Sequence, residues 1–542
     1  MNASAGPSAE PAPAGAGAGA GAGRGALVFV GFMGAGKSSA ARIAAAAASG
    51  RDPLDSDRLL EQRFGHPIEV EFERAGEAAF RAAEEELVCS LLARAGPGEA
   101  ISLGGGAVGS ERVRQALGSH TTVLLEVTVE LAWERAGHKR RPLARDRSEF
   151  ERLYESRRGL YEDVADAIVP GGDREVIARA LPELRRLADA RRAEGHGARL
   201  VWATSASGDY PVYLGPGLLG PGAPWPALPA GGASRRFLVT DEHVGPLYGD
   251  RVGPLAAPAV TLPAGEQHKS LEGAGRVWRE LAGAGMTGHD HLVALGGGVV
   301  GDLAGFCAAT YQRGVAVVHV PTSLVAQVDS AYGGKTGIDL PEAKNYVGAY
   351  HQPAGVIVDP DLLGTLPAPE LAAGYVEVLK TALIAGGPLW ERVAEGQQPD
   401  EQMILGCART KLQIVAADER DAGPRQTLNL GHTVGHAIET ATGYARYRHG
   451  EAVGLGLLAA LRLSGQDELC DQVRALLDAR GLPVALRGAD PEDVLAAVAR
   501  DKKRTPEGVP FVLVERPGAV CPGTLVSERD LRAAVDELAA GG

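Results

Sequence analysis

The feature that most constrains this chain is a glycine-rich loop, GFMGAGKS at residues 31–38, between an apolar run and a helix-forming segment. The apolar run ALVFVGF reaches the first glycine, and the alanine-rich segment SSAARIAAAAAS follows Lys37. Gly31, Gly36, Lys37 and Ser38 match GxxxxGK[ST], in which backbone N–H groups face phosphates, the lysine spans the β and γ phosphates and the hydroxyl holds Mg²⁺. A strand, a glycine loop and a helix in this order predict an α/β domain that binds a nucleoside triphosphate.

A second signature lies far along the chain, GHTVGHAIE at residues 431–439, followed by His449. Two histidines four apart share one helix face, and with a carboxylate from another helix, such as Glu377 in GYVEVLK, they can form a divalent-metal site. The spacing alone nominates both His432 and His436, although a lone histidine pair is more often packing or surface. One domain cannot use both signatures, so the chain is predicted to be two enzymes fused end to end.

Length and composition set the remaining limits. The 542 residues have room for about three or four domains. A net charge of −13 argues against a general nucleic-acid binder, so anionic ligands need dedicated pockets. Five cysteines without CxxC spacing fit a reducing compartment, so we expect a cytoplasmic protein. We expect neither membrane insertion nor secretion, because no run of about 18 uncharged apolar residues and no signal-peptide pattern is present.

Composition shifts divide the chain into segments. Short valine-rich runs such as RRFLVTD, HLVALGGG and VAVVHVPTS alternate with glycine turns and predict a parallel α/β sheet. Alanine- and leucine-rich stretches then predict a mainly helical part. The predicted division is a disordered Ala/Gly/Pro-rich tail (1–25), a P-loop domain (26–188), a linker (189–204), an α/β domain (205–360) and a helical domain (361–542).

Polar residues of the first domain suggest its chemistry. Asp55 and Asp57 in LDSD lie two apart, so an extended chain would put both carboxylates on one face, suited to a metal-bound water and to a hydroxyl acceptor. The alternative for such a pair is a helix N-cap. Arg81 in AAFRAAEEE, the triplet in SLGGGAV and Arg157 in RRGLY would separately be surface charges and a turn.

Together with the P-loop, these residues make the segment from residue 26 to about 185 similar to shikimate kinase, a small P-loop fold. The resemblance implies that Asp57, Arg81 and Arg157 clamp the hydroxyls and carboxylate of shikimate, that Gly104, Gly105 and Gly106 approach it, and that Asp55 and Ser38 organise Mg²⁺. Arg157 is preferred to Arg158 because the family's arginine precedes a tyrosine, here Tyr161, by four residues. The catalytic residues would be Lys37, Asp57 and the lid residue Arg141, and the ATP-binding residues Gly31, Gly34, Gly36, Lys37, Ser38 and Ser39.

The segment from about residue 201 to 526 resembles 3-dehydroquinate synthase through GEQHKSLE, GGGVVGDLAGF, YQRG, PTSLVAQVDSAYGGKTGID, KN and RQTLNLGHTVGHAIE. The resemblance assigns the metal, Zn²⁺ or Co²⁺, to Glu377, His432 and His449, and leaves His436 in the substrate shell. It implies a Rossmann-like NAD-binding α/β domain followed by a mainly α-helical metal-binding domain, and a homodimer through this half.

The same resemblance implies the other site residues. NAD⁺ would contact Asp241, Glu266, Lys269, Gly297, Gly298, Val299, Gly301, Asp302, Thr322, Ser323, Lys335, Lys344 and Thr365. Substrate would contact Arg313, Asp329, Lys344, Asn345, Lys380, Lys411, Arg425, Asn429, His436 and Lys502. Lys335, Lys380, Arg425 and His436 would be catalytic. The implied reaction closes the ring of 3-deoxy-D-arabino-heptulosonate 7-phosphate with loss of phosphate, and NAD is regenerated in each turnover.

The sequence therefore predicts a bifunctional shikimate-pathway enzyme that uses ATP and Mg²⁺ in one half and NAD⁺ and a divalent metal in the other, with small-molecule substrates. Two alternatives stay open. The C-terminal half could be a sister sugar-phosphate cyclase or a polyol dehydrogenase, and the latter would produce net NADH. The P-loop domain could be a nucleotide-binding regulatory module, which would bind ATP without turnover that depends on shikimate.

Overall fold

The computed structural model describes residues 25–48, 50, 52–137, 146–194, 197–228, 234–500 and 509–541. Residues 1–24 of the tail expected over 1–25, together with Arg141 and Lys502, lie outside these residues. Within the described part of the chain, no helix is both long and apolar enough to cross a membrane.

The N-terminal part is built on five parallel strands in the order β2-β3-β1-β4-β5. The strands β1 and β4 are almost wholly buried, as expected for the centre of a sheet covered on both faces. The five strands are β1 (Leu27–Val30), β2 (Leu54–Asp55), β3 (Ala100–Ser102), β4 (Thr121–Glu126) and β5 (Ala167–Pro170). The helices are α1 (Lys37–Ala48), α2 (Ser56–Phe64), α3 (Ile68–Arg94), α4 (Glu111–Leu117), α5 (Val129–Gly137), α6 (Arg147–Val164) and α7 (Arg174–Glu194).

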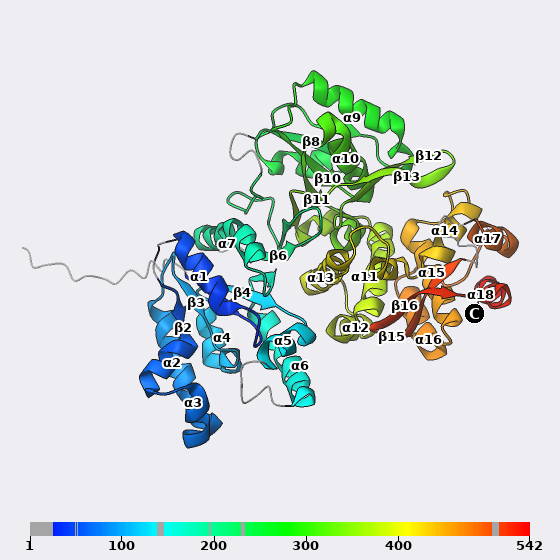
Figure 1. The fold of residues 1–542 in the computed structure, drawn as a ribbon. Helices are drawn as coiled ribbons and strands as arrows, with labels where there is room; N and C mark the ends of the chain where they lie inside the picture. Colours follow the sequence, from blue (N-terminus) through cyan, green and yellow to red (C-terminus); the bar gives the residue numbers. More distant parts are fainter. Residues whose placement is uncertain are drawn as a thin grey trace, which may run out of the picture.

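The expected linker is not a free connection. Helix α7 continues to Glu194, and β6 (Arg199–Ala203) pairs in parallel with β5 and antiparallel with β7 (Tyr210–Leu214). Leu200, Val201 and Trp202 are all buried, so both faces of β6 are covered. The turn-forming residues before and after β6 have the composition of a linker. The apolar run between them nevertheless forms a strand that pairs on both sides. One sheet of twelve strands therefore runs through both halves (Figure 1).

The second half of that sheet continues in the order β7-β14-β11-β10-β8-β9, and its strands from β14 to β9 are parallel. These strands are β8 (Arg236–Asp241), β9 (Val260–Leu262), β10 (His291–Gly296), β11 (Ala316–Pro321) and β14 (Gly355–Val358). Helices α9 (Leu271–Gly283) and α10 (Gly298–Thr310) pack on them, and β12 (Lys335–Leu340) and β13 (Ala343–Tyr350) form a separate hairpin. This arrangement agrees with the predicted parallel α/β sheet.

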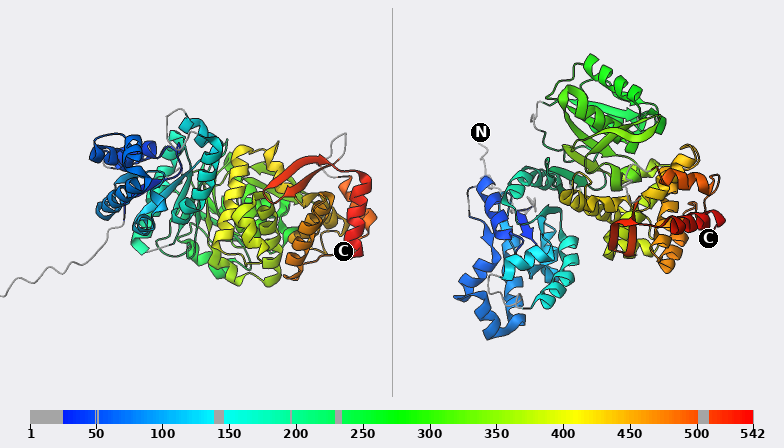
Figure 2. Two further views of the ribbon diagram at one scale, coloured as in Figure 1. Left: turned by 90° about the horizontal axis from the view of Figure 1, so that it is seen from below. Right: turned by 45° about the vertical axis from the view of Figure 1, so that its right-hand side comes forward.

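The C-terminal part is mainly helical, as expected, with one added hairpin of β15 (Pro510–Arg516) and β16 (Ala519–Leu525). Its centre is α11 (Ala368–Ala385), in which every residue from Ala373 to Ile384 is buried. Around it lie α12 (Gly387–Ala394), α13 (Glu401–Ala417), α14 (His432–Ala441), α15 (His449–Leu463), α16 (Asp467–Asp478), α17 (Pro491–Val498) and α18 (Glu528–Ala540). Figure 2 shows the P-loop part at one end of the molecule and this helical part at the other.

Candidate functional sites

The glycine loop lies between β1 and α1, where the sequence placed it. Gly31, Gly34 and Gly36 all have positive φ, which residues with a Cβ rarely adopt. The ammonium of Lys37 donates to the carbonyls of Gly31 (2.9 Å) and Phe32 (3.1 Å). The loop therefore curls around its own lysine at the N-terminus of α1, an arrangement suited to phosphate.

The aspartate pair is arranged differently from the extended geometry that we expected. Asp55 ends β2 and caps α2, where its Oδ1 accepts from the backbone N–H of Arg58 at 3.3 Å. Asp57 lies in the first turn of that helix. The chain turns between them because a carboxylate at the N-cap stabilises the helix start. The two carboxylates thus do not share a strand face, and the helix-cap alternative is correct for Asp55.

Asp57 and Arg81 meet at the glycine triplet that follows β3. A Cβ placed on Gly104 would lie 2.5 Å from the Asp57 carboxylate, and one on Gly106 would lie 2.0 Å from the Arg81 guanidinium. Gly104 and Gly106 therefore leave no room for a side chain unless these two groups move. Carboxylate, guanidinium and backbone converge at this edge of the sheet, and the polar groups expected to bind shikimate lie together.

The two candidate arginines of α6 point to different partners. Arg157 donates to the carbonyl of Gly105 at 3.2 Å, and the hydroxyl of buried Tyr161 donates to the same oxygen at 2.5 Å. Burial raises the pKa of Tyr161 to about 12, so the phenol stays protonated and remains a donor. Arg158 instead pairs with Glu162. Arg157 is thus the arginine that faces the triplet.

Two further residues at this site were missed from the sequence. Glu84 is buried and holds Arg81 at 2.6 Å, and burial raises the pKa of its carboxyl although Arg81 opposes that shift. Its spacing of three residues from Arg81 on α3 was the available signal. Arg135 on α5 donates to the carbonyls of Gly34 (3.5 Å) and Gly172 (3.4 Å) and so joins the P-loop to the loop after β5.

In the second half, the residues expected to hold NAD gather at the carboxyl edge of the parallel strands. Asp241 ends β8, Gly297 follows β10 and Thr322 follows β11. The backbone N–H of Thr322 donates to the carbonyl of Gly296 at 3.0 Å, which ties two of these loops together. Gly298, Val299, Gly301 and Asp302 form the start of α10, Ser323 follows Thr322, and Thr365 bonds the hydroxyl of Tyr248 at 2.7 Å. Dinucleotides bind at this edge in open α/β sheets.

Lys269 is the centre of a buried ionic cluster beside that edge. Its ammonium lies 3.0 Å from Asp302, 3.3 Å from Glu266 and 3.8 Å from Asp339. Burial would lower the pKa of Lys269, but the three carboxylates outweigh burial and raise it. Lys344 lies 3.8 Å from Glu266, and Asn345 donates its backbone N–H to Asp339.

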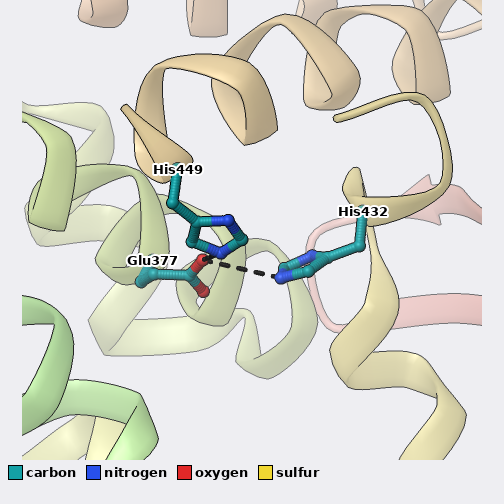
Figure 3. A group of neighbouring side chains, drawn as sticks. All are labelled: Glu377, His432 and His449. Atoms are coloured by element: carbon teal, nitrogen blue, oxygen red, sulfur yellow. Dashed lines mark ion pairs between the residues drawn. The ribbon is translucent and has the colours of Figure 1, made fainter. Parts of the chain in front are cut away.

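The predicted metal ligands come from three helices and converge (Figure 3). Glu377 on α11, His432 on α14 and His449 on α15 each offer one ligand atom, and these atoms lie within 4.8 Å of one another. The Nε2 atoms of His432 and His449 are 3.7 Å and 3.6 Å from Oε1 of Glu377. Glu377 is 1% exposed, its Oε2 lies 2.5 Å from the ammonium of Lys380, and its Oε1 faces both imidazoles. Two imidazoles and a buried carboxylate oxygen that faces both of them fit a divalent cation with an open coordination position.

A second combination, His436, Glu439 and His449, also lies within 4.8 Å and shares His449 with the first. Glu439 was missed from the sequence, although it stands within the quoted GHTVGHAIE motif. Its carboxylate accepts from Nδ1 of His449 at 3.3 Å and lies 3.4 Å from the ammonium of Lys344. A carboxylate at Nδ1 leaves Nε2 free to coordinate, so Glu439 orients a ligand of the first group.

Next to Glu377 lies a set of buried cations. Lys380 contacts Glu377 (2.5 Å) and Asp329 (2.8 Å), and Lys411 also pairs with Asp329. Burial would lower the pKa of Lys380, but Asp329 and Glu377 raise it, whereas burial dominates at Lys411 and lowers its pKa. Arg425 is 2% exposed and donates to the carbonyl of Gly333 at 3.0 Å.

Two predicted substrate residues, Arg313 and Asn429, and the predicted NAD-contacting residue Lys335 lie away from these cations or have other partners. Arg313 precedes β11, at the sheet edge opposite the glycine loop, and it is exposed without a hydrogen bond or ion pair to other described residues. Asn429 donates to the carbonyl of Gln426, and Lys335 pairs with Asp421 at 2.6 Å. The structure thus brings Lys380, Lys411, Asp329 and Arg425 together. Arg313 lies apart from them, because a residue that precedes β11 stands at the sheet edge opposite the glycine loop.

Comparisons with known proteins agree with this division. Family models match in three places: shikimate kinase over residues 33–185, 3-dehydroquinate synthase N-terminal over 259–373 and 3-dehydroquinate synthase C-terminal over 374–504. The 3-dehydroquinate synthase of Caulobacter vibrioides is 43% identical over 329 residues, which cover 56% of this chain and 89% of that protein. That of Methylococcus capsulatus is 43% identical over 348 residues, which cover 60% and 96%.

Two solved structures resemble about three fifths of this chain. A 2-epi-5-epi-valiolone synthase from Streptomyces hygroscopicus with NAD⁺ and Zn²⁺ bound is 27% identical, with a TM-score of 0.54, over 61% of this chain and 96% of that one. A 2-deoxy-scyllo-inosose synthase complexed with carbaglucose-6-phosphate, NAD⁺ and Co²⁺ shares the fold at 22% identity, with a TM-score of 0.55, over 63% of this chain and 100% of that one.

Proposed function

The chain belongs to the 3-dehydroquinate synthase family and carries a shikimate kinase domain before it, and from this premise we propose which residues perform the two reactions. The enzyme combines a kinase with a cyclising lyase, both of the shikimate pathway. The observation that carries the assignment is the presence of two clusters of polar side chains, one at the P-loop and the triplet after β3, and one between α11, α14 and α15.

In the kinase half, positioning and charge account for the chemistry, because phosphoryl transfer needs little covalent help from the protein. Arg81 and Arg157 bind the carboxylate of shikimate, and Asp57 accepts the proton of the attacked hydroxyl. Lys37 moves from its loop carbonyls to the β and γ phosphates of ATP, while Ser38 and Asp55 organise Mg²⁺. The support is the convergence of Asp57, Arg81 and the triplet within one contact shell.

In the synthase half, a divalent metal at Glu377, His432 and His449 would supply Lewis acidity toward a substrate hydroxyl, and NAD⁺ along α10 would accept and return a hydride. Glu439 holds the imidazole of His449 in the orientation for binding. Lys380, Lys411 and Arg425 orient the anionic groups of the substrate.

The substrate proposed is 3-deoxy-D-arabino-heptulosonate 7-phosphate, which offers a carboxylate and a phosphate to these cations. A polyol dehydrogenase would have no use for two buried lysines paired with one carboxylate, Asp329, and for the buried Arg425 beside Lys411. All five cysteines are free, in keeping with the proposed cytoplasmic location. A homodimer through the synthase half stays part of the proposal, on the resemblance to the family.

One phosphorus NMR time course tests both activities. The purified chain is given ATP, Mg²⁺, shikimate, NAD⁺, Zn²⁺ and the heptulosonate phosphate, while absorbance follows NADH. ADP with a new phosphomonoester, and free phosphate without net NADH, are expected. Accumulating NADH would identify a dehydrogenase instead, and ATP bound without turnover that depends on shikimate would make the P-loop domain a regulatory module.

A further inference from the structure

The two halves meet through charged side chains as well as through the shared sheet. Arg409, on α13 of the synthase half, lies 2.5 Å from the carboxylate of Glu126 and 3.0 Å from that of Glu162, both in the kinase half. Its side chain is 11% exposed, so the ion pairs are shielded from water. Gln413, one helical turn further on, donates to the other oxygen of Glu126 at 3.0 Å. Figure 1 shows α13 at the border between the two halves.

Both carboxylates belong to elements that form the kinase site. Glu162 follows Tyr161 on α6, the helix whose Arg157 and Tyr161 both donate to the carbonyl of Gly105. Glu126 is the last residue of β4, and its carbonyl accepts from Gly171. The carbonyl of Leu125, one residue earlier, packs closely on Gly31 of the P-loop. A cation that holds Glu126 and Glu162 therefore fixes α6 relative to the strand behind the nucleotide loop.

The same helix reaches the synthase site from its other side. Lys411 is two residues after Arg409, which corresponds to about 200° around a helix, so the two side chains leave on opposite faces. Lys411 donates to the backbone carbonyl of Asp329 at 2.6 Å and pairs with its carboxylate. Helix α13 is thus anchored in the synthase site while it presents Arg409 to the kinase.

We propose that Arg409 is a positioning residue for the kinase reaction, supplied by the synthase half. It holds α6 so that Arg157 and Tyr161 stay against the glycine triplet, where the acceptor substrate binds. The inference rests on the proposed shikimate kinase activity. It gives the fusion a physical consequence, because the acceptor site of the first enzyme depends on a side chain of the second.

The test is steady-state kinetics of full-length variants. Arg409→Met should raise KM for shikimate, with kcat/KM falling on the order of 10-fold to 100-fold, because a small displacement of a substrate clamp has effects of this size. KM for ATP, kcat at saturating shikimate and the synthase rate should stay near wild type, since the loss falls on substrate binding. Arg409→Lys should recover part of the loss, because it keeps the charge but cannot span two carboxylates equally well.

Two further variants separate positioning from general loosening. Glu162→Gln changes only the kinase side of the pair and should also raise KM for shikimate. Arg199→Met removes another arginine at the junction, which pairs with Glu401 at the start of α13 at 3.6 Å and, among the described residues, makes no ion pair with α6 or β4. It should leave KM for shikimate unchanged.

An unchanged KM in both Arg409→Met and Glu162→Gln, or an equal rise in Arg199→Met, would overturn the inference. A rise in KM for ATP that matches the rise for shikimate would do the same, since it would show a general disturbance. If the wild-type chain itself lacks ADP formation that depends on shikimate, the proposed kinase function fails instead, and the two failures are therefore distinct.

Discussion

Replacement of Glu439 by glutamine should weaken metal binding although Glu439 is not among the three proposed ligands. The variant keeps the shape and a hydrogen-bond acceptor but removes the charge that lies 3.3 Å from Nδ1 of His449 and 3.4 Å from Nζ of Lys344. At 3.3 Å, two unit charges interact by about 5 kcal/mol at an effective dielectric constant of about 20. Metal affinity depends only on how much more strongly the Glu439 carboxylate interacts with the metal-bound imidazole than with the metal-free one. Substitution of a residue that hydrogen-bonds a metal ligand costs about 10-fold to 100-fold in metal affinity.

The expected loss is therefore about 1.4–2.7 kcal/mol of metal-binding free energy. The assay is competition for Zn²⁺ against a chromophoric chelator at mildly alkaline pH, where protons compete little for the histidines. The absorbance of bound Co²⁺ gives a second readout that does not depend on turnover.

Glu183→Gln is the matched control. Glu183 is as buried as Glu439, at 3% exposure, but it bonds Tyr213 and the backbone of Ala227 at the junction of the halves. It should leave metal affinity unchanged. If Glu439→Gln binds Zn²⁺ as tightly as wild type while its unfolding transition is intact, the orienting role assigned to Glu439 is wrong.

Three other variants test other parts of the molecule. Asp57→Asn should lower the kinase kcat by about 10²-fold to 10⁴-fold, because it removes the proton acceptor, while the affinity for ATP persists. Coupled-assay kinetics measures kcat, and calorimetry measures ATP binding. Turnover at the wild-type rate would contradict the role of Asp57. Burial lowers the pKa of His319 from 6.5 to about 4. Between pH 6.5 and pH 4, the imidazole is therefore protonated in the unfolded chain but neutral in the folded one. The free energy of unfolding should fall as pH drops below about 6.5, by up to about 3 kcal/mol near pH 4. His319→Gln should flatten that part of the urea-unfolding profile, and an unchanged slope would refute the assignment. Leu200→Ala in β6 should cost about 2–5 kcal/mol of unfolding free energy and lower the inactivation temperature of both activities together, because β6 joins the two halves of the sheet. Loss of one activity alone would show that the halves unfold separately.

Local patterns in the sequence were sufficient to predict the main elements and much of both sites. The strand, loop and helix around Lys37 depend on neighbours in the chain, and so does the placement of His432 and His436 on one helix. The parallel sheet followed from valine-rich runs, since such strands are buried on both faces. For Asp55 and Asp57, however, the same local reasoning gave the wrong backbone, because capping of α2 competes with an extended strand.

The choice of His449 over His436 as a proposed metal ligand came from the resemblance to a known family and not from spacing. The fold shows how three helices bring Glu377, His432 and His449 together. Contacts between segments far apart in the sequence gave no signal. Glu439 reaches Lys344 across 95 residues, and Arg409 reaches Glu126 and Glu162 across more than 240 residues. Neither contact has a period or a motif, because each depends on where whole helices pack.

The sequence by itself thus determined the two chemistries, the first through a P-loop of adjacent residues and the second through motifs that resemble a known family. Tertiary structure alone decided that the expected linker is strand β6 and that one sheet serves both halves. The physical reason is that a strand needs neighbouring strands for its hydrogen bonds and other elements to cover its apolar faces. The composition of residues 189–204 gives no information on which distant strands will lie beside them.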